Sequence, residues 1–327
     1  MSHITEAPVV LKATGVKKYF AANAGLGKKK YVKAVDGVDI ELHKGEIYGL
    51  VGETGCGKST LGRTLMMLTE PTAGDIEILG QNVTELRGRE LKDMRRKIQM
   101  VFQDPYTSLD PKQKVGDILM EALEIHGIGT KEERLEIAMD IMHKMGLRTE
   151  HFYRYPHEFS GGQRQRVGLA RALILNPEII VCDEPVSALD VSIQAQIINL
   201  LQDLREKQDI SLLFIAHDMS VVKYISDRIG VMYLGHLMEE AEGETLFEDT
   251  LHPYSQALLS AVPEVNPHVH KERIMLEGDL PSPMNPPKGC VFHTRCPYAV
   301  ERCSEVTPTL KEVRKGHRVA CLRYENG

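Results

Sequence analysis

Short apolar runs alternate with longer amphipathic stretches over most of the first 220 residues. Each run is about as long as one buried strand, and the stretches between them carry apolar residues at helical spacing. The strands expected on this basis are 46–51, 75–79, 98–102, 178–184 and 211–217, and the expected helices are 58–68, 86–97, 163–175 and 192–207. This alternation predicts an α/β fold with a mainly parallel sheet and helices on both of its faces.

The segment from 115 to about 157 departs from this rhythm because it contains no strand-like run. It holds the stretch GDILMEALEIHG and then a second helix whose start, Thr130 to Glu133, has a capping-box pattern. We therefore expect a helical subdomain over about 104–160. From about 236 onward, prolines, histidines and four of the six cysteines gather. The predicted domains are residues 1–240 and a Cys-rich C-terminal extension over 241–327.

A glycine-rich loop, GETGCGKS (52–59), follows the first of the buried strands and precedes a helix. Its spacing is that of a phosphate-binding loop, in which glycines let successive N–H groups wrap a phosphate and the helix dipole adds positive potential. Lys58 should reach the phosphate oxygens, and the hydroxyl of Ser59 should bind Mg²⁺. The predicted nucleotide-binding residues are Gly52, Gly55, Cys56, Gly57, Lys58, Ser59 and Thr60.

Polar side chains also stand where three other buried strands end, at the sheet edge where open α/β folds bind nucleotides. Asp183 suits a place near Mg²⁺, and Glu184 can act as the general base for an attacking water. Gln103 can contact Mg²⁺ or that water, and His217 can contact the γ-phosphate. The alternative is that the two carboxylates cap a turn before Pro185 and that the histidine is structural.

A second pair of glycines occurs in FSGGQ (159–163), at the start of a predicted helix. Because helix interiors avoid glycine, two in a row at a helix start suggest backbone amides that bind an anion. Ser160, Gly161, Gly162 and Gln163 would form this receptor. The chain already has a complete phosphate-binding loop about a hundred residues earlier, so the second receptor needs a separate explanation.

These motifs together resemble one family. GETGCGKS, the glutamine of VFQDP, FSGGQ, IIVCDE, SALD (187–190) and His217 occur in the order and spacing of ATP-binding-cassette (ABC) ATPases, over roughly residues 10–240. FSGGQ is similar to the LSGGQ signature of that family, with Phe159 in place of leucine, a side chain expected to pack. The resemblance implies a P-loop (RecA-like) ABC ATPase core that binds ATP and Mg²⁺.

The resemblance also explains the second glycine pair. In this family the signature serves the ATP that is held by the opposite subunit of a head-to-tail dimer, and Asp190 resembles the D-loop aspartate that links the two sites. The family stacks adenine on an aromatic residue shortly before the first core strand. Phe20 fits that position best, Tyr19 is the alternative, and either could instead be a core residue.

The tail is similar to that of the ATPase subunits of oligopeptide and dipeptide importers, in HPYSQALLSAVP (252–263) and GDLPSPMNPPKGCVFHTRCP (278–297). The resemblance implies ATP hydrolysis that energises uptake of di- or oligopeptides across the cytoplasmic membrane. It implies as partners a second ABC ATPase subunit in a heterodimer, two transmembrane permease subunits and an extracytoplasmic substrate-binding protein. The protein would then lie peripherally on the cytoplasmic face of the membrane. The alternatives are import of nickel, glutathione or oligosaccharides, or a non-transport ABC ATPase.

The four cysteines of the extension are spaced C-x5-C-x6-C-x17-C, at Cys290, Cys296, Cys303 and Cys321. Four thiolates can hold zinc or an iron–sulfur cluster, and the spacing matches neither of the common C-x2-C zinc signatures. The resemblance implies a [4Fe–4S] cluster; Zn²⁺ and four unligated thiols are the alternatives.

Charge, hydropathy and the two remaining cysteines limit which partners, membrane spans and thiol chemistry are expected. The formal net charge of −6 disfavours a nucleic-acid partner. No run approaches the about 18 consecutive apolar residues that a membrane span requires. Cys182 lies within a predicted strand and should be an inert buried thiol, whereas Cys56, in the phosphate-binding loop, should make the ATPase sensitive to alkylating reagents.

Overall fold

The computed structural model describes residues 7–23, 29–187, 189–262 and 273–325. The chain divides into two compact units. The first unit comprises Met1–Val10, His43–Glu46 and Glu85–Leu213, and the second comprises Leu11–Leu42, Ile47–Thr84 and Phe214–Gly327.

The first unit contains three neighbouring strands in the order β8-β7-β6. Their bounds are β6 (Ile98–Val101), β7 (Ile179–Asp183) and β8 (Ser211–Ile215), the last of which ends in the second unit. β6 and β7 are parallel, and every residue of β7 and β8 is buried. Continuous apolar strands of this kind are typical of a parallel sheet that is covered on both faces.

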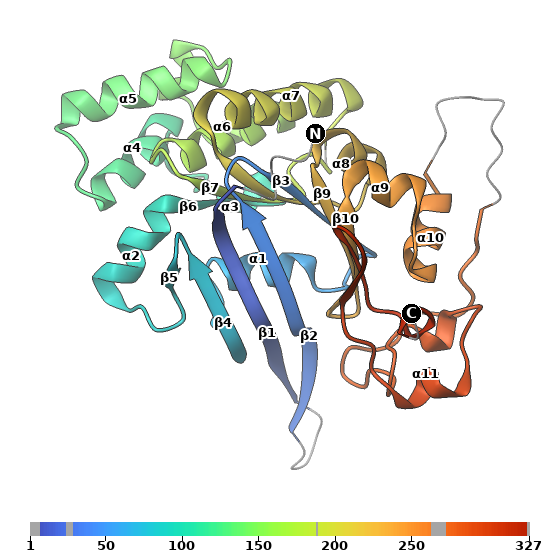
Figure 1. The fold of residues 1–327 in the computed structure, drawn as a ribbon. Helices are drawn as coiled ribbons and strands as arrows, with labels where there is room; N and C mark the ends of the chain where they lie inside the picture. The colour runs from blue at the N-terminus through green and yellow to red at the C-terminus, as the bar shows by residue number, and fades with distance from the viewer. Residues whose placement is uncertain (1–6, 24–28, 188, 263–272, 326–327) are drawn as a thin grey trace. The chain divides into compact units, whose positions relative to one another are not determined.

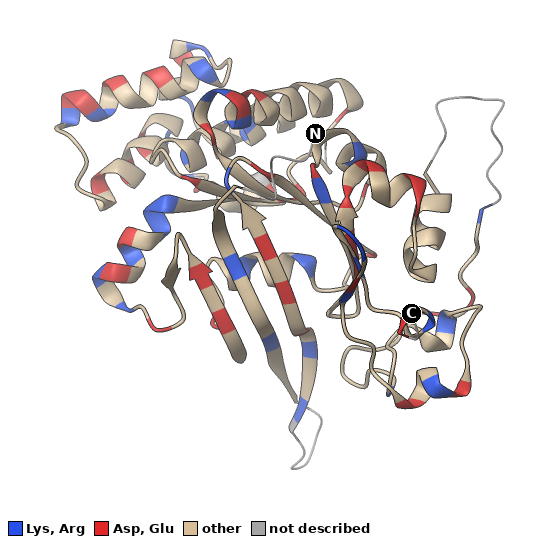
Figure 2. Cartoon of the chain, viewed as in Figure 1, with Lys and Arg blue, Asp and Glu red and all other residues tan. Residues whose placement is uncertain are grey.

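The helices of the first unit begin and end where the sequence provides a reason. α2 (Gly88–Lys97) finishes with three consecutive basic residues, which favour the negative end of the helix dipole, and Figure 2 shows this excess of Lys and Arg along the helix. α6 (Gly161–Leu173) begins at the serine of FSGGQ, and α7 (Val191–Gln208) begins after the aspartate of SALD.

Between β6 and α6 the described residues of 115–157 form helices and no strand, as the sequence predicts. These helices are α4 (Val115–Ile125), α5 (Lys131–Lys144) and the 3₁₀ turns η2 (Thr149–Tyr153) and η3 (Pro156–Glu158), and the short helix α3 (Pro105–Ser108) precedes them. α5 has the predicted capping box, in which the Thr130 hydroxyl accepts from Glu133 N–H and the Glu133 carboxylate accepts from Thr130 N–H. α4 and α5 pack side by side (Figure 1).

A four-stranded sheet of order β2-β1-β4-β5 belongs mainly to the second unit (Figure 1). Its strands are β1 (Val9–Asn23), β2 (Lys29–His43), β4 (Ala73–Ile78) and β5 (Gln81–Asn82). β4 pairs antiparallel with both β1 and β5. The predicted strand 75–79 therefore exists, but it lies in an antiparallel sheet apart from the parallel strands.

The other strands of the second unit follow the order β11-β12-β10-β9-β3. They are β3 (Ile47–Val51), β9 (Arg228–Tyr233), β10 (His236–Glu242), β11 (Lys311–Arg314) and β12 (His317–Val319). β3 and β9 are parallel, whereas β9, β10, β12 and β11 pair antiparallel in turn. β10 runs across residue 240, and the last strand of the chain pairs with it.

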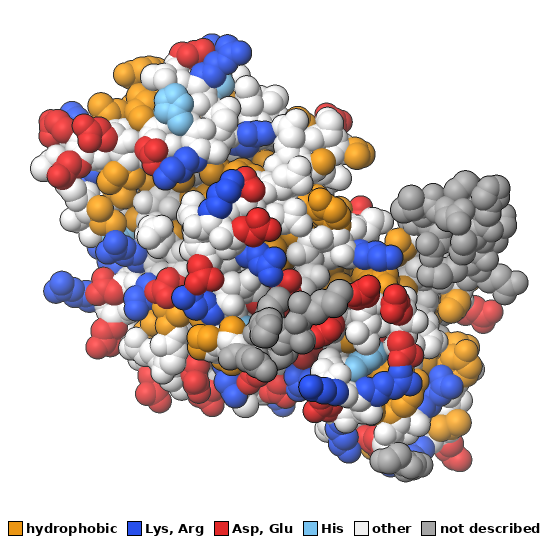
Figure 3. Space-filling model, turned by 45° about the horizontal axis from the view of Figure 1, so that its top comes forward, with side chains coloured by type: hydrophobic (Ala, Val, Ile, Leu, Met, Phe, Trp, Pro, Cys, Tyr) orange, Lys and Arg blue, Asp and Glu red, His pale blue; other side chains and the backbone are white. Residues whose placement is uncertain are grey.

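Short helices complete the second unit. They are α1 (Lys58–Leu65), α8 (Met219–Ile225), α9 (Gly243–Glu248), α10 (Pro253–Ser260), α11 (Glu301–Glu305), η4 (His293–Arg295) and η5 (Leu322–Tyr324). Among the described residues, no helix has the length and apolarity that a membrane crossing demands. Acidic and basic side chains intermingle over the face of the protein that Figure 3 shows.

Candidate nucleotide-binding and catalytic site

The phosphate-binding loop lies in the second unit, between β3 and α1. Gly52, Gly55 and Gly57 have φ angles of 149°, 82° and 113°, a region that side chains rarely adopt. A Cβ atom at Gly52 would lie 2.1 Å from the carbonyl oxygen of Met232, and one at Gly57 would lie 2.1 Å from that of Ala34. The backbones of β9 and β2 thus require glycine at both ends of the loop.

Lys58 is the first residue of α1, and its side chain is buried. Its Nζ atom donates to the carbonyl oxygens of Gly52, at 2.7 Å, and Glu53, at 3.2 Å. The amine therefore lies inside the loop that precedes it, where a phosphate oxygen could replace a carbonyl as its partner. Ser59 and Thr60 follow at the start of the helix and are half-buried.

Two cysteines lie near the predicted nucleotide residues, and both are buried. Cys56 is 1% exposed, and burial raises the pKa of its thiol. This burial disfavours the expected sensitivity of the ATPase to alkylating reagents, because a buried protonated thiol is a poor nucleophile. Cys182 is fully buried in β7, as predicted, and burial raises its pKa to about 12.

The first unit places Gln103 and Glu184 in contact. Gln103 follows β6, and its Nε2 atom donates to the Glu184 Oε2 atom at 2.9 Å. Asp183, the last residue of β7, is fully buried immediately before Glu184. Two polar residues that lie 81 positions apart in the sequence thus meet at the carboxyl ends of two parallel strands.

Glu184 has a φ angle of 47°, which is unusual for a residue other than glycine. Such a conformation costs on the order of 1 kcal/mol or more, and it occurs preferentially at functional sites. The N–H and the hydroxyl of Ser187 both donate to the Glu184 carbonyl, at 3.4 and 3.1 Å, and hold the turn. The backbone thereby turns the Glu184 carboxylate toward Gln103.

The FSGGQ segment forms the start of α6. Ser160 is exposed and is the N-cap, and its hydroxyl accepts from Gln163 N–H at 3.4 Å. The Gln163 side chain returns to accept from Ser160 N–H at 3.0 Å. Phe159 is buried and makes an edge contact with His151, with ring centroids 5.1 Å apart. The phenylalanine that replaces leucine in the signature therefore packs, as expected.

The two glycines of this segment differ in their surroundings. A Cβ atom at Gly162 would lie 2.6 Å from Ile193 Cγ2, so packing against α7 requires glycine there. A Cβ atom at Gly161 would have Leu189 Cδ2, at 3.7 Å, as its nearest contact, which is ordinary van der Waals separation. The fold of the described chain therefore does not explain Gly161.

Arg164 connects α6, which begins with the signature, to the short helix α3 that follows Gln103, a link that sequence reasoning missed. The buried guanidinium lies 3.7 Å from the centroid of the Tyr106 ring and donates to the carbonyl oxygen of Pro156 at 2.6 Å. No local signal predicts the pair, because the cation–π contact depends on α3 packing against α6.

Two further predicted residues lie at helix starts. Asp190 is exposed and is the N-cap of α7, although its side chain makes no capping hydrogen bond. Ala188, within the SALD motif, lies outside the described residues. His217 belongs to the second unit and is exposed between β8 and α8, whose N-cap is Asp218.

The two adenine candidates are consecutive on β1, so their side chains point to opposite faces of the strand. The Tyr19 hydroxyl donates to Asp36, and Lys33 Nζ lies 5.4 Å from the centroid of its ring. Burial and the hydrogen bond to Asp36 raise the pKa of Tyr19. Phe20, in contrast, is 42% exposed, and Lys18 Nζ lies 5.0 Å from the centroid of its ring.

The four cysteines of the extension are neighbours. Cys290 is buried and the other three are half-buried, and Cys290 N–H donates to the Cys303 carbonyl at 2.8 Å. Burial raises the pKa of Cys290 to about 11, and the charges of the other three thiolates act in the same direction. Nevertheless, the described chain contains no group of three or more His, Cys, Asp or Glu side chains arranged to hold a metal ion. The structure thus gives no support for the predicted cluster.

Comparison with known proteins shows the family to which the chain is similar. The sequence model described as "ABC transporter" matches residues 35–187, and the one described as "Oligopeptide/dipeptide transporter, C-terminal region" matches residues 238–303. The chain is 53% identical to the putative oligopeptide transport ATP-binding protein YkfD of Bacillus subtilis, over 97% of this chain and 96% of that protein. It is 49% identical to the dipeptide transport ATP-binding protein DppF of Haemophilus influenzae, over 99% of both.

Solved structures agree with this result. The ATP-binding cassette MJ0796, in a dimeric post-hydrolysis state bound to ADP and Pi, has a TM-score of 0.65 and 30% sequence identity, and the match covers 71% of this chain and 98% of that one. The ADP conformation of MJ1267, a cassette of an ABC transporter, has a TM-score of 0.61 and 27% identity, with 75% and 96% coverage.

Proposed function

Because the chain belongs to the ABC transporter family, among the oligopeptide and dipeptide transport ATP-binding proteins, we infer that it hydrolyses ATP to drive the import of di- or oligopeptides. The observation that carries this inference is the combination on one chain of the ABC region and the C-terminal region of peptide transporters. We accordingly propose residues 1–240 as the nucleotide-binding domain, with a helical subdomain over about 104–160, and 241–327 as the transporter-specific extension.

The residues present fit ATP and Mg²⁺. The amides of the phosphate-binding loop and the amine of Lys58 would hold the phosphates, and the positive end of α1 adds to the potential there. Mg²⁺ prefers oxygen ligands and usually keeps several waters, and we propose Ser59, Gln103 and Asp183 as the residues that serve it, directly or through such a water. When bound, it would neutralise charge that develops on the phosphates.

Glu184 is the proposed general base, with Gln103 and His217 assisting. The hydrogen bond from Gln103 orients the Glu184 carboxylate, and the strained backbone at Glu184 is consistent with a catalytic role. Glu184→Gln should therefore bind ATP normally while its turnover falls about 100-fold or more, the usual contribution of a general base. Ordinary hydrolysis by this variant would remove Glu184 from that role.

We propose that Ser160, Gly161, Gly162 and Gln163 bind the nucleotide of a second ABC ATPase subunit, and that Asp190 links the two nucleotide sites. The exposed position of Ser160 at the start of a thirteen-residue helix supports this, because the helix dipole favours an anion there. Ser160→Arg should block hydrolysis in the assembled dimer while this chain still binds its own ATP. Loss of ATP binding in the isolated subunit would instead place Ser160 in the chain's own site.

The second ATPase subunit is proposed to be a different chain, so that the dimer is a heterodimer. Two membrane-embedded permease subunits and an extracytoplasmic binding protein complete the proposed transporter, and this chain would lie on the cytoplasmic face of the membrane. The helical subdomain and the loop of Gln103 are the proposed contacts with the permeases. Co-purification of the tagged chain with one permease pair and a second ATPase would support this assembly, and a stable homodimer on the permeases would exclude the heterodimer.

We propose Phe20 as the residue that stacks on adenine. Its ring is exposed, whereas Tyr19 is already engaged by Asp36 and Lys33. An exposed ring can cover a base without breaking contacts that the fold uses.

We also propose that Cys290, Cys296, Cys303 and Cys321 hold a [4Fe–4S] cluster. This proposal rests on the spacing of the four cysteines and on the resemblance of the tail to that of peptide importers, and four thiolates can also hold zinc. Protein purified without oxygen should contain iron and absorb broadly near ~400 nm, as thiolate-bound clusters do. Stoichiometric zinc in a colourless preparation would favour Zn²⁺, and the absence of both metals would leave four free thiols.

The transported solute is tested most directly with the complete transporter in vesicles. ATP-dependent uptake should be strongest for a di- or oligopeptide and should disappear with Glu184→Gln. Uptake of nickel, glutathione or an oligosaccharide in place of peptides would retain the ATPase assignment and change the cargo.

A further inference from the structure

Two residues of the C-terminal extension, both within the second unit, bind the phosphate-binding loop. The Arg295 Nη1 atom lies 3.0 and 3.2 Å from the two carboxylate oxygens of Glu53, the second residue of the loop. The Tyr254 hydroxyl accepts from the backbone N–H of the same glutamate at 2.9 Å. One residue of the nucleotide loop is thus held through its backbone and its side chain by residues about 200 or more positions away.

The side chains of Tyr254 and Arg295 are shielded from solvent. Tyr254 is fully buried, with its ring centroid 4.7 Å from that of Tyr233 and 5.4 Å from that of the fully buried Phe292. The Arg295 side chain is 10% exposed, and that of Glu53 is 27% exposed. An ion pair in such surroundings is screened less by salt than a surface pair, so it has a greater electrostatic effect on its neighbours.

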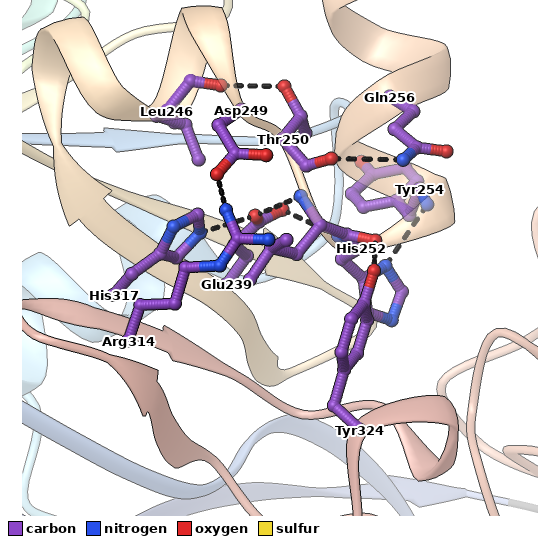
Figure 4. Close-up of polar contacts among 11 residues, drawn as sticks. Glu239, Leu246, Asp249, Thr250, His252, Tyr254, Gln256, Arg314, His317 and Tyr324 are labelled. Carbon is purple, nitrogen blue, oxygen red and sulfur yellow. Dashed lines mark hydrogen bonds and ion pairs between the residues drawn. The ribbon is translucent and has the colours of Figure 1, made fainter. Parts of the chain in front are cut away.

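A buried polar cluster fixes Tyr254 in place (Figure 4). The carboxylate of Glu239, on β10, accepts from the N–H groups of Leu251 and His252 at 2.7 and 3.0 Å and faces the Nε2 atom of His317 at 2.8 Å. The Nδ1 atom of His252 then accepts from Tyr254 N–H at 3.0 Å and caps α10. The position of the Tyr254 hydroxyl therefore depends on the strand pairing of the extension.

The ion pair between Arg295 and Glu53 has an electrostatic consequence for the binding of a triphosphate. Glu53 places a carboxylate in a loop whose task is to surround several negative phosphate oxygens, and an unneutralised carboxylate there would repel them. We propose that Arg295 and Tyr254 are positioning residues for ATP binding. Arg295 neutralises Glu53, and Tyr254 fixes its backbone amide, so that the remaining amides of the loop and Lys58 meet the phosphates. This inference rests on the proposed nucleotide site.

The test is a titration of the full chain with ATP in the presence of Mg²⁺, together with steady-state ATPase kinetics of the assembled transporter. Arg295→Ala should weaken ATP affinity about tenfold, equivalent to about 1.4 kcal/mol. KM for ATP should rise while kcat stays near that of the wild type, and the defect should shrink at high salt because it arises from repulsion. Arg295→Lys should recover part of the affinity.

The decisive control is Glu53→Gln, which removes the carboxylate and leaves the shape of the side chain. Added to Arg295→Ala, it should restore ATP affinity to within about threefold, since little unneutralised charge then remains beside the phosphates. Alone it should bind ATP at least as tightly as the wild type, so it serves as the test if Arg295→Ala fails to fold. Tyr254→Phe should weaken ATP affinity several-fold at unchanged salt dependence, because it removes a hydrogen bond and no charge.

Three results would overturn the inference: unchanged ATP affinity in folded Arg295→Ala, failure of Glu53→Gln to restore the double variant, or weaker ATP binding by Glu53→Gln alone. If the wild-type chain itself bound no ATP, the proposed nucleotide site would fail instead. Thermal unfolding of each variant shows which proteins are folded before their affinities are compared.

Discussion

Gly161 offers a way to separate the function of the signature segment from its fold. The residue is the first of α6 and has no positive φ angle, and a Cβ atom there would make one ordinary contact, at 3.7 Å with Leu189. Alanine therefore fits the folded chain without strain. Because alanine restricts the unfolded chain more than glycine does, Gly161→Ala should raise the free energy of unfolding by about 0.5–1 kcal/mol.

The same methyl group should impair hydrolysis. A phosphate oxygen must approach a backbone amide to about 2.7–3.2 Å to accept its hydrogen bond, and a methyl group beside that amide occupies part of the approach. A hydrogen bond to a charged group contributes about 1.5–3 kcal/mol, so its loss should reduce ATPase activity of the assembled dimer by about 10- to 100-fold. Stability and activity thus change in opposite directions.

Urea-induced unfolding of the isolated chain and ATPase assays of the assembled transporter measure the two effects. Gly162→Ala is the matched control, because its Cβ would lie 2.6 Å from Ile193 Cγ2 and should lower the free energy of unfolding. Wild-type ATPase activity in a stabilised Gly161→Ala protein would refute the assignment of Gly161 to a nucleotide site. Loss of stability together with activity would show that Gly161 is a structural residue.

Three further predictions concern other parts of the chain. Glu239→Ala should lower the free energy of unfolding by about 3 kcal/mol or more in denaturant titrations, because it leaves His317 and two backbone N–H groups buried without their acceptor. Glu239→Gln keeps one oxygen and should lower the free energy of unfolding less. Equal decreases for the two variants would contradict the hydrogen-bond explanation. Burial lowers the pKa of His252 from 6.5 to about 4, so between these pH values the unfolded chain takes up a proton that the folded chain refuses, and stability should fall by up to about 3 kcal/mol on acidification. His252→Asn, which retains a capping oxygen, should flatten this part of the pH–stability curve, and an unchanged slope would assign the acid sensitivity elsewhere. Phe20→Ala should weaken ATP affinity about tenfold through loss of stacking, and Tyr19→Phe should weaken it less; the reverse order in a binding titration would move adenine to Tyr19.

Three of the strands that the sequence predicted, β3, β7 and β8, are completely buried. β7 and β8 are continuous apolar runs, and their observed bounds lie within two residues of the expected ones. β1 and β2 escaped prediction because lysines and acidic residues interrupt their apolar pattern, and their strand character comes from pairing in a sheet with one exposed face. β11 and β12 escaped prediction because both are short and depend on pairing, β12 with β10 and β11 with β12.

Some site residues can likewise be predicted from a local sequence signal, and others cannot. Glu184 and Gln103 stand at the ends of apolar strands, and this local signal sufficed to predict that both lie at the same edge of the sheet, where their side chains are hydrogen-bonded. Arg295 has no such signal, because its partner Glu53 lies 242 residues earlier in the chain. A contact of this kind depends on the complete tertiary fold.

The glycines show how structure can indicate where a residue acts. Gly52 and Gly57 are required by carbonyl groups of their own chain, and Gly162 is required by Ile193. Gly161 has room for a side chain and an ordinary helical backbone, yet it carries none, although alanine would stabilise the helix. Glycine at this position lowers the stability of the helix, and no contact among the described residues near it offsets this loss. The reason for the glycine should therefore lie in a molecule that approaches from outside. The phosphate proposed to be held by a second subunit would meet that requirement, because a bare backbone lets it reach the amide of Gly161.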